Sequence, residues 1–383
     1  MAETRAKARD AAEAIELDLE ELPAVINMAD ALESGSATVH DELGDNLCYD
    51  WGFVEENKEA VDEAIKNAAH VTTVELINNR LVPNPMEARV AIGEYDRAGD
   101  MSTLYTPSQN PHVIRLLMGA FVLGIPEHKL RVVAPDVGGG FGAKNFAYVE
   151  QALLLWAARR AGCAVKWIAS RSEVFLSDHQ ARDHWAEATL AVMPDGRFQA
   201  LAIDSIANLG AYMAGSSGGV QTNQYAHLPG TLYAIPNVGL RVRSTVTNTA
   251  PIGVTRGPGF GEMNNMVERR MDAAAAKLGM DATVLRRKNL IAPSAMPAAN
   301  PLGGTVDSGD FPKAFEAALK AADYTGLDAR KSTTPAPLLR GFGIANHIKA
   351  TGGSPDENVE ILFREDGGVD LITGTQTLGQ GHE

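Results

Sequence analysis

The spacing of apolar residues predicts strands across much of the chain. Runs rich in β-branched and aromatic residues, typical of strands, occur at residues 71–77, 88–95, 102–105, 130–137, 164–169 and 241–246. Residues 184–207 predict a long hairpin that turns at Pro194-Asp195-Gly196, and residues 358–373 predict a second hairpin. Hairpin strands pair antiparallel, so the pattern favours an α+β fold over a repeated βαβ arrangement.

Helical runs separate these strands. Residues 2–14, 111–123, 146–160, 262–278, 281–290 and 311–322 consist mostly of good helix formers. Their ends carry the expected signals: Asn110 and Pro111 predict a helix start, and Gly124 and Gly279 predict helix ends. The three prolines between residues 292 and 301 predict a loop or subdomain boundary.

The first residues look like the end of a domain. The helix at 2–14 has a mostly alanine stripe and should pack closely on a neighbour, a strand is expected at 15–19, and residues 43–58 predict a linker. One helix and one strand cannot bury a core alone. We therefore expect that the chain opens inside a domain whose first part precedes Met1.

Composition and charge narrow the possible partners. The chain has 383 residues, is 45% hydrophobic and 21% charged, and carries a net charge of −14 with a pI of about 5.1. This balance, without a basic tract, disfavours nucleic acid and anionic membranes. The longest apolar runs are too short to span a bilayer, and no signal peptide pattern opens the sequence. The only cysteines, Cys48 and Cys163, form no CxxC pair, which fits a cytoplasmic location and excludes a cysteine-held iron–sulfur cluster in this chain.

Gly138, Gly139 and Gly140 form a glycine turn between a predicted strand and a predicted helix. Such a turn brings free backbone N–H groups close to a ligand, but it also fits a plain sharp turn. Gly138-x-Gly140-x-x-Ala143 even satisfies a dinucleotide fingerprint, and Ser170 and Arg171 would suit a 2′-phosphate. A nicotinamide-dependent dehydrogenase is therefore an alternative, although the hairpin at 184–207 interrupts the alternation that a doubly wound sheet needs.

Two further glycine-rich turns surround Arg256 and Gln380. An arginine before a helix can clamp an anion or a developing negative charge, and Gln109 precedes another predicted helix. Spacing alone favours a surface loop side chain at Gln109 and at Arg256 over a ligand-binding role. Together, the three turns and Gln109 predict backbone wrapped around one extended polar ligand. His179 and His184 are interpreted as structural.

Several ordered motifs resemble a known family. They are Ala-Ala-Glu-Ala-Ile-Glu-Leu-Asp-Leu-Glu-Glu-Leu-Pro-Ala-Val at 11–25, Ser-Gln-Asn-Pro-His at 108–112, Pro-Asp-Val-Gly-Gly-Gly-Phe-Gly-Ala-Lys at 135–144, the loop at 247–259, Leu-Arg-Arg-Lys-Asn-Leu at 285–290 and Gly-Gln-Gly-His-Glu at 379–383. Nearly the whole chain thereby resembles the molybdopterin-binding large subunit of the xanthine dehydrogenase and aldehyde oxidase family, in the separate-subunit form of carbon monoxide dehydrogenase.

The resemblance implies a domain plan. Residues 1–50 would be the C-terminal part of an α/β hammerhead-like domain, residues 51–295 the first molybdopterin-binding domain, and residues 296–383 the incomplete beginning of the second. The family's catalytic glutamate is expected beyond Glu383. We therefore expect the chain to be truncated at both ends and inactive alone, and a non-catalytic cofactor-binding scaffold is a third alternative.

The resemblance also implies roles for individual residues. Arg256 would face the substrate as the catalytic arginine, and Gln109 would hydrogen-bond an oxo ligand of molybdenum. The remaining cofactor-binding residues would be Gly139, Gly140, Phe141, Gly142, Gly257, Gln380, Gly381 and His382. No protein side chain would ligate the metal, because the pterin dithiolene holds it.

The implied activity is hydroxylation of an aldehyde or N-heteroaromatic substrate with oxygen taken from water. The implied cofactor is molybdopterin with molybdenum, in the cytosine dinucleotide form. A small iron–sulfur (2Fe–2S) subunit and a medium FAD subunit would drain the electrons, within a dimer of heterotrimers.

The sequence departs from the family pattern at three places. Gly257 replaces the cysteine of copper-type carbon monoxide oxidisers, so efficient carbon monoxide oxidation is not expected. Asn145 replaces a glutamate of purine oxidisers, which argues against xanthine. Phe260 and Gly261 stand where many relatives have Arg-Pro, so we assign Asn145 and Phe260 to an altered substrate pocket.

Overall fold

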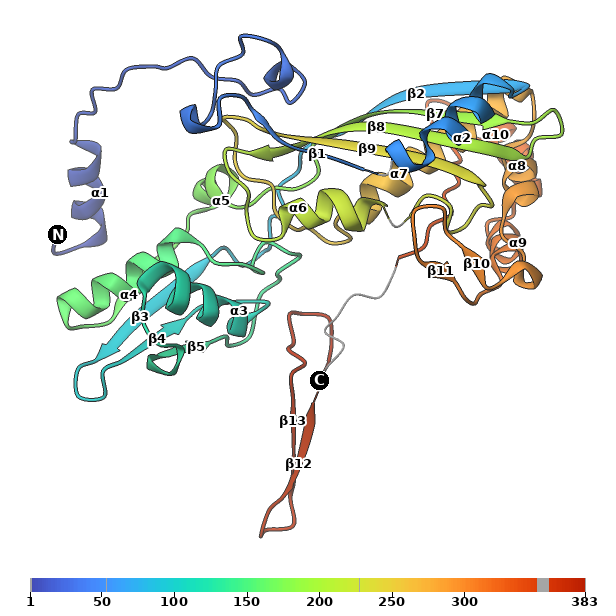
Figure 1. Ribbon diagram of the computed structural model, residues 1–383. Coiled ribbons are helices and arrows are strands. Elements are labelled where there is room, and N and C mark those ends of the chain that lie inside the picture. Colours follow the sequence, from blue (N-terminus) through green and yellow to red (C-terminus); the bar gives the residue numbers. More distant parts are fainter. Residues whose placement is uncertain (1, 53, 227, 350–357, 383) are drawn as a thin grey trace.

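The computed structural model describes residues 2–52, 54–226, 228–349 and 358–382, and two open sheets dominate it (Figure 1). The larger sheet has the strand order β1-β9-β8-β7-β2, and the smaller one has the order β5-β4-β3-β6. Both sheets mix parallel and antiparallel pairs. The expected α+β character is therefore present as a mixed α/β architecture with open sheets.

Long antiparallel strands build the larger sheet. Its members are β1 (Leu47–Gly52), β2 (His70–Asn78), β7 (His184–Val192), β8 (Phe198–Gly210) and β9 (Asn237–Val246). Only β8 and β9 pair in parallel. The predicted hairpin at 184–207 is confirmed, with Pro194, Asp195 and Gly196 in its turn.

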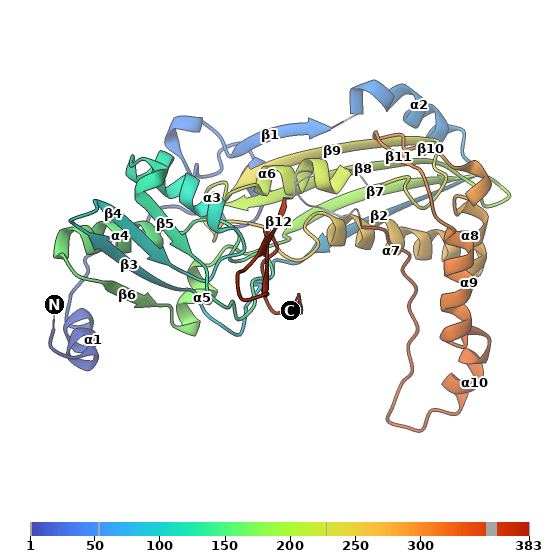
Figure 2. The same ribbon diagram turned by 90° about the horizontal axis from the view of Figure 1, so that it is seen from below.

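Helices cover both faces of this sheet. Helix α7 (Phe260–Leu278) packs on β2 and β7, whereas α2 (Val54–Lys66) packs on β8 and β9 (Figure 2). Successive residues of β7 point to opposite faces of the sheet. Ala188 accordingly joins the core cluster under α7, while Ala191 packs with Val61 and Ala64 of α2.

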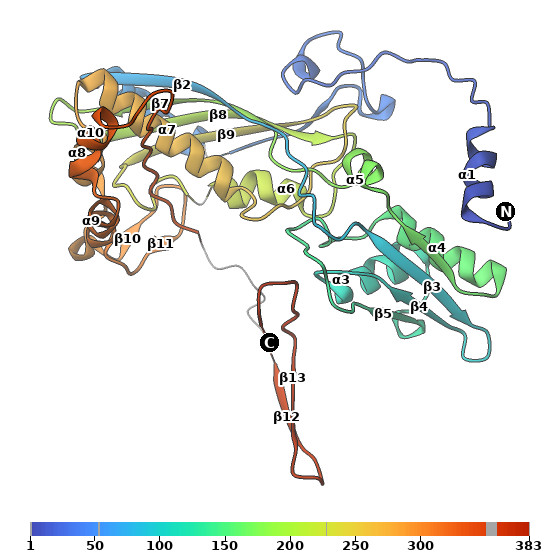
Figure 3. The same ribbon diagram turned by 180° about the vertical axis from the view of Figure 1, so that it is seen from behind.

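The smaller sheet lies beside the larger one and carries α4 (Figure 3). It consists of β3 (Val90–Asp96), β4 (Met101–Tyr105), β5 (Leu130–Val133) and β6 (Val165–Ile168), and α4 spans Val149–Ala161. The helix lies so close to β3 that a Cβ on Gly93 would come within 2.5 Å of the Leu154 carbonyl oxygen.

The pairing in this sheet argues against the dehydrogenase alternative. Only β4 and β5 run parallel, whereas β3 is antiparallel to both of its neighbours. A dinucleotide-binding fold needs a parallel sheet around the glycine turn. Ser170 and Arg171 are engaged elsewhere, because Ser170 caps α5 (Arg171–Ser177) and Arg171 donates to the Met86 carbonyl.

Shorter elements complete the chain. The remaining helices are α1 (Arg5–Glu13), α3 (Pro111–Leu116) with its π-helical continuation (Leu117–Leu123), α6 (Ser217–Gly219) with a π-helical turn (Val220–Gln224), α8 (Ala282–Asn289), α9 (Phe311–Ala321) and α10 (Leu327–Ser332). The 3₁₀ turns are Asp30–Leu32, Asp41–Leu43, Glu127–Lys129, Pro293–Ala295 and Tyr324–Gly326. Two small hairpins pair β10 (Ala298–Ala299) with β11 (Thr305–Val306) and β12 (Val359–Phe363) with β13 (Val369–Thr373).

Several predictions near the N-terminus are wrong. Residues 43–58 form no linker, because β1 and the start of α2 lie there and β1 pairs with β9. Residues 15–19 form no strand and are exposed. Every residue of α1 is exposed too, so its alanine stripe packs on nothing within the described chain. Further along the chain, the strand expected at residues 130–137 is shorter than predicted, because it ends at Val133.

Candidate active site

A cavity of about 870 Å³ lies where the glycine turn, the loop before α7 and the C-terminal turn meet. The structure therefore brings the three predicted glycine-rich turns to one place. The residues that line the cavity are Met86, Gln109, Val137, Gly138, Gly139, Gly140, Phe141, Gly142, Asn145, Ser216, Val254, Thr255, Arg256, Pro258, Leu378, Gly379 and Gln380.

The glycine turn is packed too tightly for side chains, as Gly140 and Gly142 show. A Cβ on Gly140 would lie 2.5 Å from the Gln109 carboxamide, and a Cβ on Gly142 would lie 2.1 Å from the Val254 carbonyl oxygen. Gly142 also has φ +101°, and Phe141 has φ +54° although it carries a side chain. Close approach and left-handed backbone together explain the glycines here.

Gln109 is held firmly at the edge of the cavity. Its side-chain oxygen accepts hydrogen bonds from the backbone N–H of Gly142 (2.8 Å) and of Lys144 (3.3 Å). The backbone N–H of Gln109 donates to the Lys144 carbonyl at 2.9 Å. Asn110 caps α3 as predicted, by accepting from the Val113 N–H. Its side-chain NH₂ group has no hydrogen-bond partner in the described chain, and Gln109 lines the cavity, so this group is available to a ligand.

Arg256 is fixed through its backbone and free at its side chain. Its N–H donates to the Phe141 carbonyl at 2.9 Å, which joins the loop before α7 to the glycine turn. The side chain is exposed at the cavity, and no carboxylate of the described chain pairs with it. An unpaired guanidinium at a cavity wall can bind an anion or stabilise developing negative charge.

The other predicted site residues divide into two groups. Asn145 and Gln380 line the cavity, but Gly257, Gly381 and His382 are outside its lining, and the last two are exposed. Phe260 lines a separate hollow of about 250 Å³ and lies under the Lys349 ammonium group.

Sequence reasoning missed other wall residues. Met86 and Ser216 belong to no recognisable motif, so only the fold brings them to the cavity. Thr255 lies directly beside the predicted arginine, and its hydroxyl is buried without a hydrogen-bond partner in the described chain. That orphaned hydroxyl is a polar group left available to a ligand.

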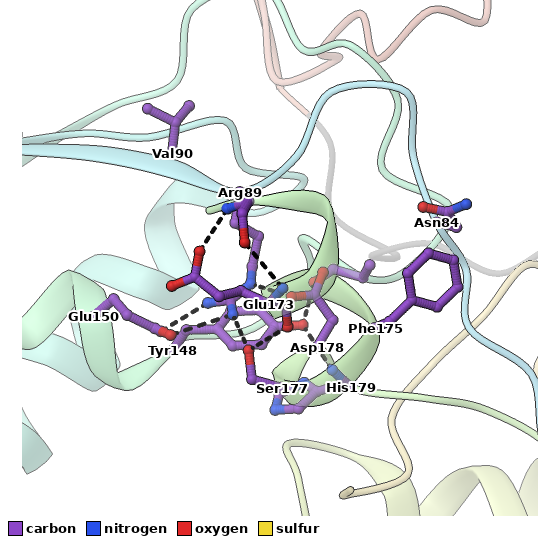
Figure 4. Close-up of polar contacts among 12 residues, drawn as sticks. Asn84, Arg89, Val90, Tyr148, Glu150, Glu173, Phe175, Ser177, Asp178 and His179 are labelled. Carbon is purple, nitrogen blue, oxygen red and sulfur yellow. Dashed lines mark hydrogen bonds and ion pairs between the residues drawn. The ribbon is translucent and has the colours of Figure 1, made fainter. Parts of the chain in front are cut away.

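A buried ionic network supports the glycine turn from behind (Figure 4). Arg89, at the start of β3, binds Asp178 at 2.5 Å and Glu150 at 2.7 Å, and its guanidinium lies 3.8 Å over the Tyr148 ring. The Tyr148 hydroxyl donates to the Ala143 carbonyl at 2.7 Å. Burial raises the pKa of the Asp178 carboxyl, against the lowering effect of Arg89.

Glu87 supports the turn from its other end. Its carboxylate accepts from the Gly138 N–H at 2.8 Å and from the Lys144 ammonium at 2.6 Å. Burial lowers the pKa of Lys144, and Glu87 partly offsets this effect. The turn is therefore fastened at Gly138, at Ala143 and at Lys144, which holds its backbone N–H groups in place for a ligand.

Comparison with known proteins identifies the architecture around this cavity. Residues 39–290 match the family model described as the molybdopterin cofactor-binding domain. The chain belongs to this family. Its relatives include large subunits of molybdenum hydroxylases from bacteria.

Two curated relatives and one solved structure illustrate the similarity. The chain is 31% identical to the carbon monoxide dehydrogenase large chain of Hydrogenophaga pseudoflava, over 100% of this chain and 51% of that protein. It is 28% identical to the nicotine 6-hydroxylase large subunit of Paenarthrobacter nicotinovorans, over 100% of this chain and 48% of that protein. The crystal structure of quinoline 2-oxidoreductase from Pseudomonas putida 86 superposes with a TM-score of 0.88 and 30% identity, over 100% of this chain and 50% of that one. The chain thus spans about half the length of the curated relatives it matches.

This molybdopterin-binding family member offers backbone amides, carboxamides and one arginine at its cavity. Among the residues that the structure describes, no group of three or more His, Cys, Asp or Glu side chains is arranged to hold a metal ion. No helix in the described ranges is long and apolar enough to cross a membrane.

His179 stacks on Tyr148 and His184 is buried beside Tyr225, which agrees with a structural interpretation of both.

Proposed function

We propose that this chain is the cofactor-binding part of a molybdenum hydroxylase large subunit that oxidises an aldehyde or an N-heteroaromatic compound with oxygen from water. The observation that carries the proposal is the cavity itself. Three loops that are distant in sequence line it, and each supplies groups suited to a polar, anionic ligand. The family match and the relatives' names support the same assignment.

The residues present fit molybdopterin. The glycines of the closely packed turn from Gly139 to Gly142 bring backbone to the cavity wall, and the orphaned Thr255 hydroxyl offers a further hydrogen-bonding group. Gln109 and Gln380 add carboxamides at the same cavity. When bound, the cofactor would supply the metal and the two-electron redox chemistry. The protein's own part is to hold the cofactor and to orient the substrate.

Gly257, Gly381 and His382 complete the proposed cofactor-binding set, although they lie beside the cavity rather than on its wall. Gly257 follows Arg256 directly, and its φ of +71° gives the loop its bend. Gly381 and His382 follow Gln380 in the C-terminal turn. We infer that these three residues contact the outer part of the cofactor, for which we propose the cytosine dinucleotide form.

Arg256 is the residue to which we assign the catalytic role within this chain. Its unpaired positive charge would stabilise negative charge that develops on the substrate in the transition state. Asn145 offers a neutral amide at the same cavity, where a carboxylate would bind a purine. Gly257 offers no thiolate to a copper ion. These two positions favour aldehydes and N-heteroaromatics over xanthine and carbon monoxide.

The wider organisation follows the same proposal. Residues 1–50 would belong to a hammerhead-like domain, residues 51–295 to the first molybdopterin-binding domain and residues 296–383 to the second. Relatives named as large chains and large subunits support partner subunits that carry a 2Fe–2S cluster and FAD. A cytoplasmic dimer of heterotrimers is the assembly we propose.

Turnover by the assembled enzyme tests the proposal. The full-length subunit, together with its partner subunits, would be assayed with aldehydes and N-heteroaromatics and an artificial electron acceptor. We expect Gln109→Ala and Arg256→Met each to lower kcat by about 10²-fold or more while the fold stays intact. Gln199→Ala, which alters a strand residue outside the cavity lining, is the matched control and should keep full activity. Wild-type turnover in both cavity variants would remove the roles assigned to them.

A further inference from the structure

Two consecutive residues before β7 adopt a backbone conformation that side chains seldom permit. Arg182 has φ +67° and Asp183 has φ +68°. Neither is a glycine, and left-handed backbone at such residues is strained and persists only where the surroundings enforce it. The structure shows what enforces it, because the Arg80 guanidinium binds the Asp183 carboxylate at 2.8 Å and also donates to the Ala250 carbonyl.

The bend places the Arg182 guanidinium against the loop that carries Arg256. One nitrogen, Nη2, donates to the Arg256 carbonyl at 2.9 Å, and Nη1 donates to the Gly257 carbonyl at 3.1 Å. Nη1 also binds the Glu262 carboxylate at 2.6 Å. Glu262 is only 2% exposed, so it holds Arg182 from the protein interior. A planar guanidinium can make these bonds together, whereas an ammonium group cannot reproduce its fork.

The sequence of α7 leaves room for this contact. A Cβ on Gly261 would lie 3.3 Å from Cζ, Nη1 and Nη2 of Arg182, which is tighter than ordinary contact. The glycine and the arginine that packs on it therefore form one feature of this chain.

Both backbone polar groups of Arg256 are thus fixed by long-range partners. Its N–H donates to Phe141 of the glycine turn, and its carbonyl accepts from Arg182. We propose that Arg182 is a positioning residue: it clamps the Arg256–Gly257 peptide and so determines where the Arg256 guanidinium enters the cavity. The link to turnover rests on the proposed function, whereas the clamp itself does not.

Limited trypsin digestion of the 383-residue chain tests the clamp without any cofactor. Trypsin cleaves after arginine, and the carbonyl that Arg182 binds belongs to the bond after Arg256. We expect Arg182→Met to raise cleavage at Arg256–Gly257 at least about tenfold relative to cleavage after Arg330, a half-buried arginine of α10, and Arg182→Lys to raise it less. Arg243→Met, which breaks the Arg243–Asp204 ion pair on the larger sheet, is the matched control and should leave this ratio unchanged.

The ratio separates loss of the clamp from general unfolding. Unfolding raises cleavage at both bonds, whereas loss of the clamp raises it at Arg256 alone. If Arg182→Met unfolds the chain, Arg182→Lys, which retains the charge that pairs with Glu262, decides the question. An unchanged ratio in Arg182→Lys and in every folded Arg182→Met sample would overturn the proposal.

A double-mutant cycle in the assembled enzyme tests the consequence for turnover. We expect Arg182→Lys to lower kcat by about 10- to 100-fold, because misplacing a reacting group by about 1 Å costs that much. In an Arg256→Met background the same change should have no further effect, since Arg182 acts through Arg256. Additive losses would contradict positioning. Full activity of Arg256→Met alone would instead refute the proposed role of Arg256, and the digestion result would still stand.

Discussion

At the residue scale, the cavity is shaped by positions where a side chain is excluded. Gly140 and Gly142 sit where a Cβ would collide with Gln109 and with the Val254 carbonyl, respectively. Gln109 therefore holds the turn through its oxygen, and its amide nitrogen has no hydrogen-bond partner in the described chain. These contacts explain why the motif residues at 108–112 and 135–144 occur together in one sequence.

Two glycine substitutions distinguish the cost of a steric clash of an added Cβ from the cost of backbone strain at positive φ. Gly142→Ala would introduce a Cβ 2.1 Å from a carbonyl oxygen at φ +101°, so we expect it to lower the free energy of unfolding by about 3 kcal/mol or more. Gly257→Ala has φ +71° but no atom within 4 Å of the added Cβ, so strain alone should cost about 1 kcal/mol. Urea unfolding of both variants measures the difference. Equal losses would show that the close approach to Val254 is not rigid.

His179 makes stability depend on pH. Burial, with a smaller contribution from Arg89, lowers the pKa of His179 to about 4, from about 6.5 in an unfolded chain. Between these values the unfolded chain binds more protons, so stability is fully present above pH 6.5 and is lost as the pH falls towards 4. The loss is on the order of 3 kcal/mol. Burial also lowers the pKa of His184, which adds to the same trend.

Urea unfolding at pH 7 and at pH 5 checks this expectation. His179→Phe keeps an aromatic ring against Tyr148 but cannot titrate, so its stability should fall less between the two pH values than that of the wild type. His112→Phe, at a histidine on α3, is a control that should retain the wild-type pH dependence. A His179→Phe variant as pH-sensitive as the wild type would contradict the assignment.

At the element scale, the sequence predicted those helices and strands whose ends are set by neighbouring residues, such as turn residues and helix caps. The hairpins were predictable because turn residues lie between alternating strands, and α8 because Asp281 accepts from the N–H groups of Thr283 and Val284. The strand β1 was not, because it is held by its pairing with β9, almost two hundred residues away in sequence. The clamp at Arg182 was invisible for the same reason, since it lies 74 residues from Arg256. The three glycine-rich turns were visible, but only the fold could bring them to one cavity.

Arg89 joins three elements, and its loss should be costly. It connects β3 to α4 through Glu150 and to the end of α5 through Asp178, in a buried position. Arg89→Met would leave Asp178 buried without its partner, so we expect a loss of about 3–5 kcal/mol in the free energy of unfolding. Arg115→Met breaks the half-exposed pair with Glu127 and should cost less than about 1 kcal/mol. Similar small losses in both variants would show that the Arg89 network does not hold the elements together.

At the scale of the whole molecule, loops that connect the elements line the candidate cavity, while other parts of the described chain expose apolar surface. Every residue of β12 and β13 is exposed, including Val359, Ile361, Phe363, Val369 and Leu371. The hairpin projects away from both sheets (Figure 3). An exposed apolar strand pair is prone to edge-to-edge association.

Light scattering after size-exclusion chromatography tests this property. The 383-residue chain should self-associate with rising concentration, because the apolar hairpin offers both open edges and apolar faces. Ile361→Lys combined with Leu371→Lys should reduce the association without changing the sheets. Lysines at Thr305 and Ser308, exposed positions in and beside the other small hairpin, provide the control. A wild-type chain that stays monomeric at high concentration would contradict the expectation.

The central claim is that the cavity formed by the three glycine-rich turns binds molybdopterin. The most direct measurement is the amount of molybdenum and of pterin per chain in the purified full-length subunit, compared with Ser216→Trp and Ser308→Trp. Ser216 lines the cavity and Ser308 lines the separate hollow near Phe260, and both are exposed enough to accept the larger side chain. We predict about one molybdenum and one pterin in the wild type and in Ser308→Trp, and a strong reduction of both in Ser216→Trp. A wild-type subunit without pterin, or a Ser216→Trp variant that retains the wild-type content, would contradict the account.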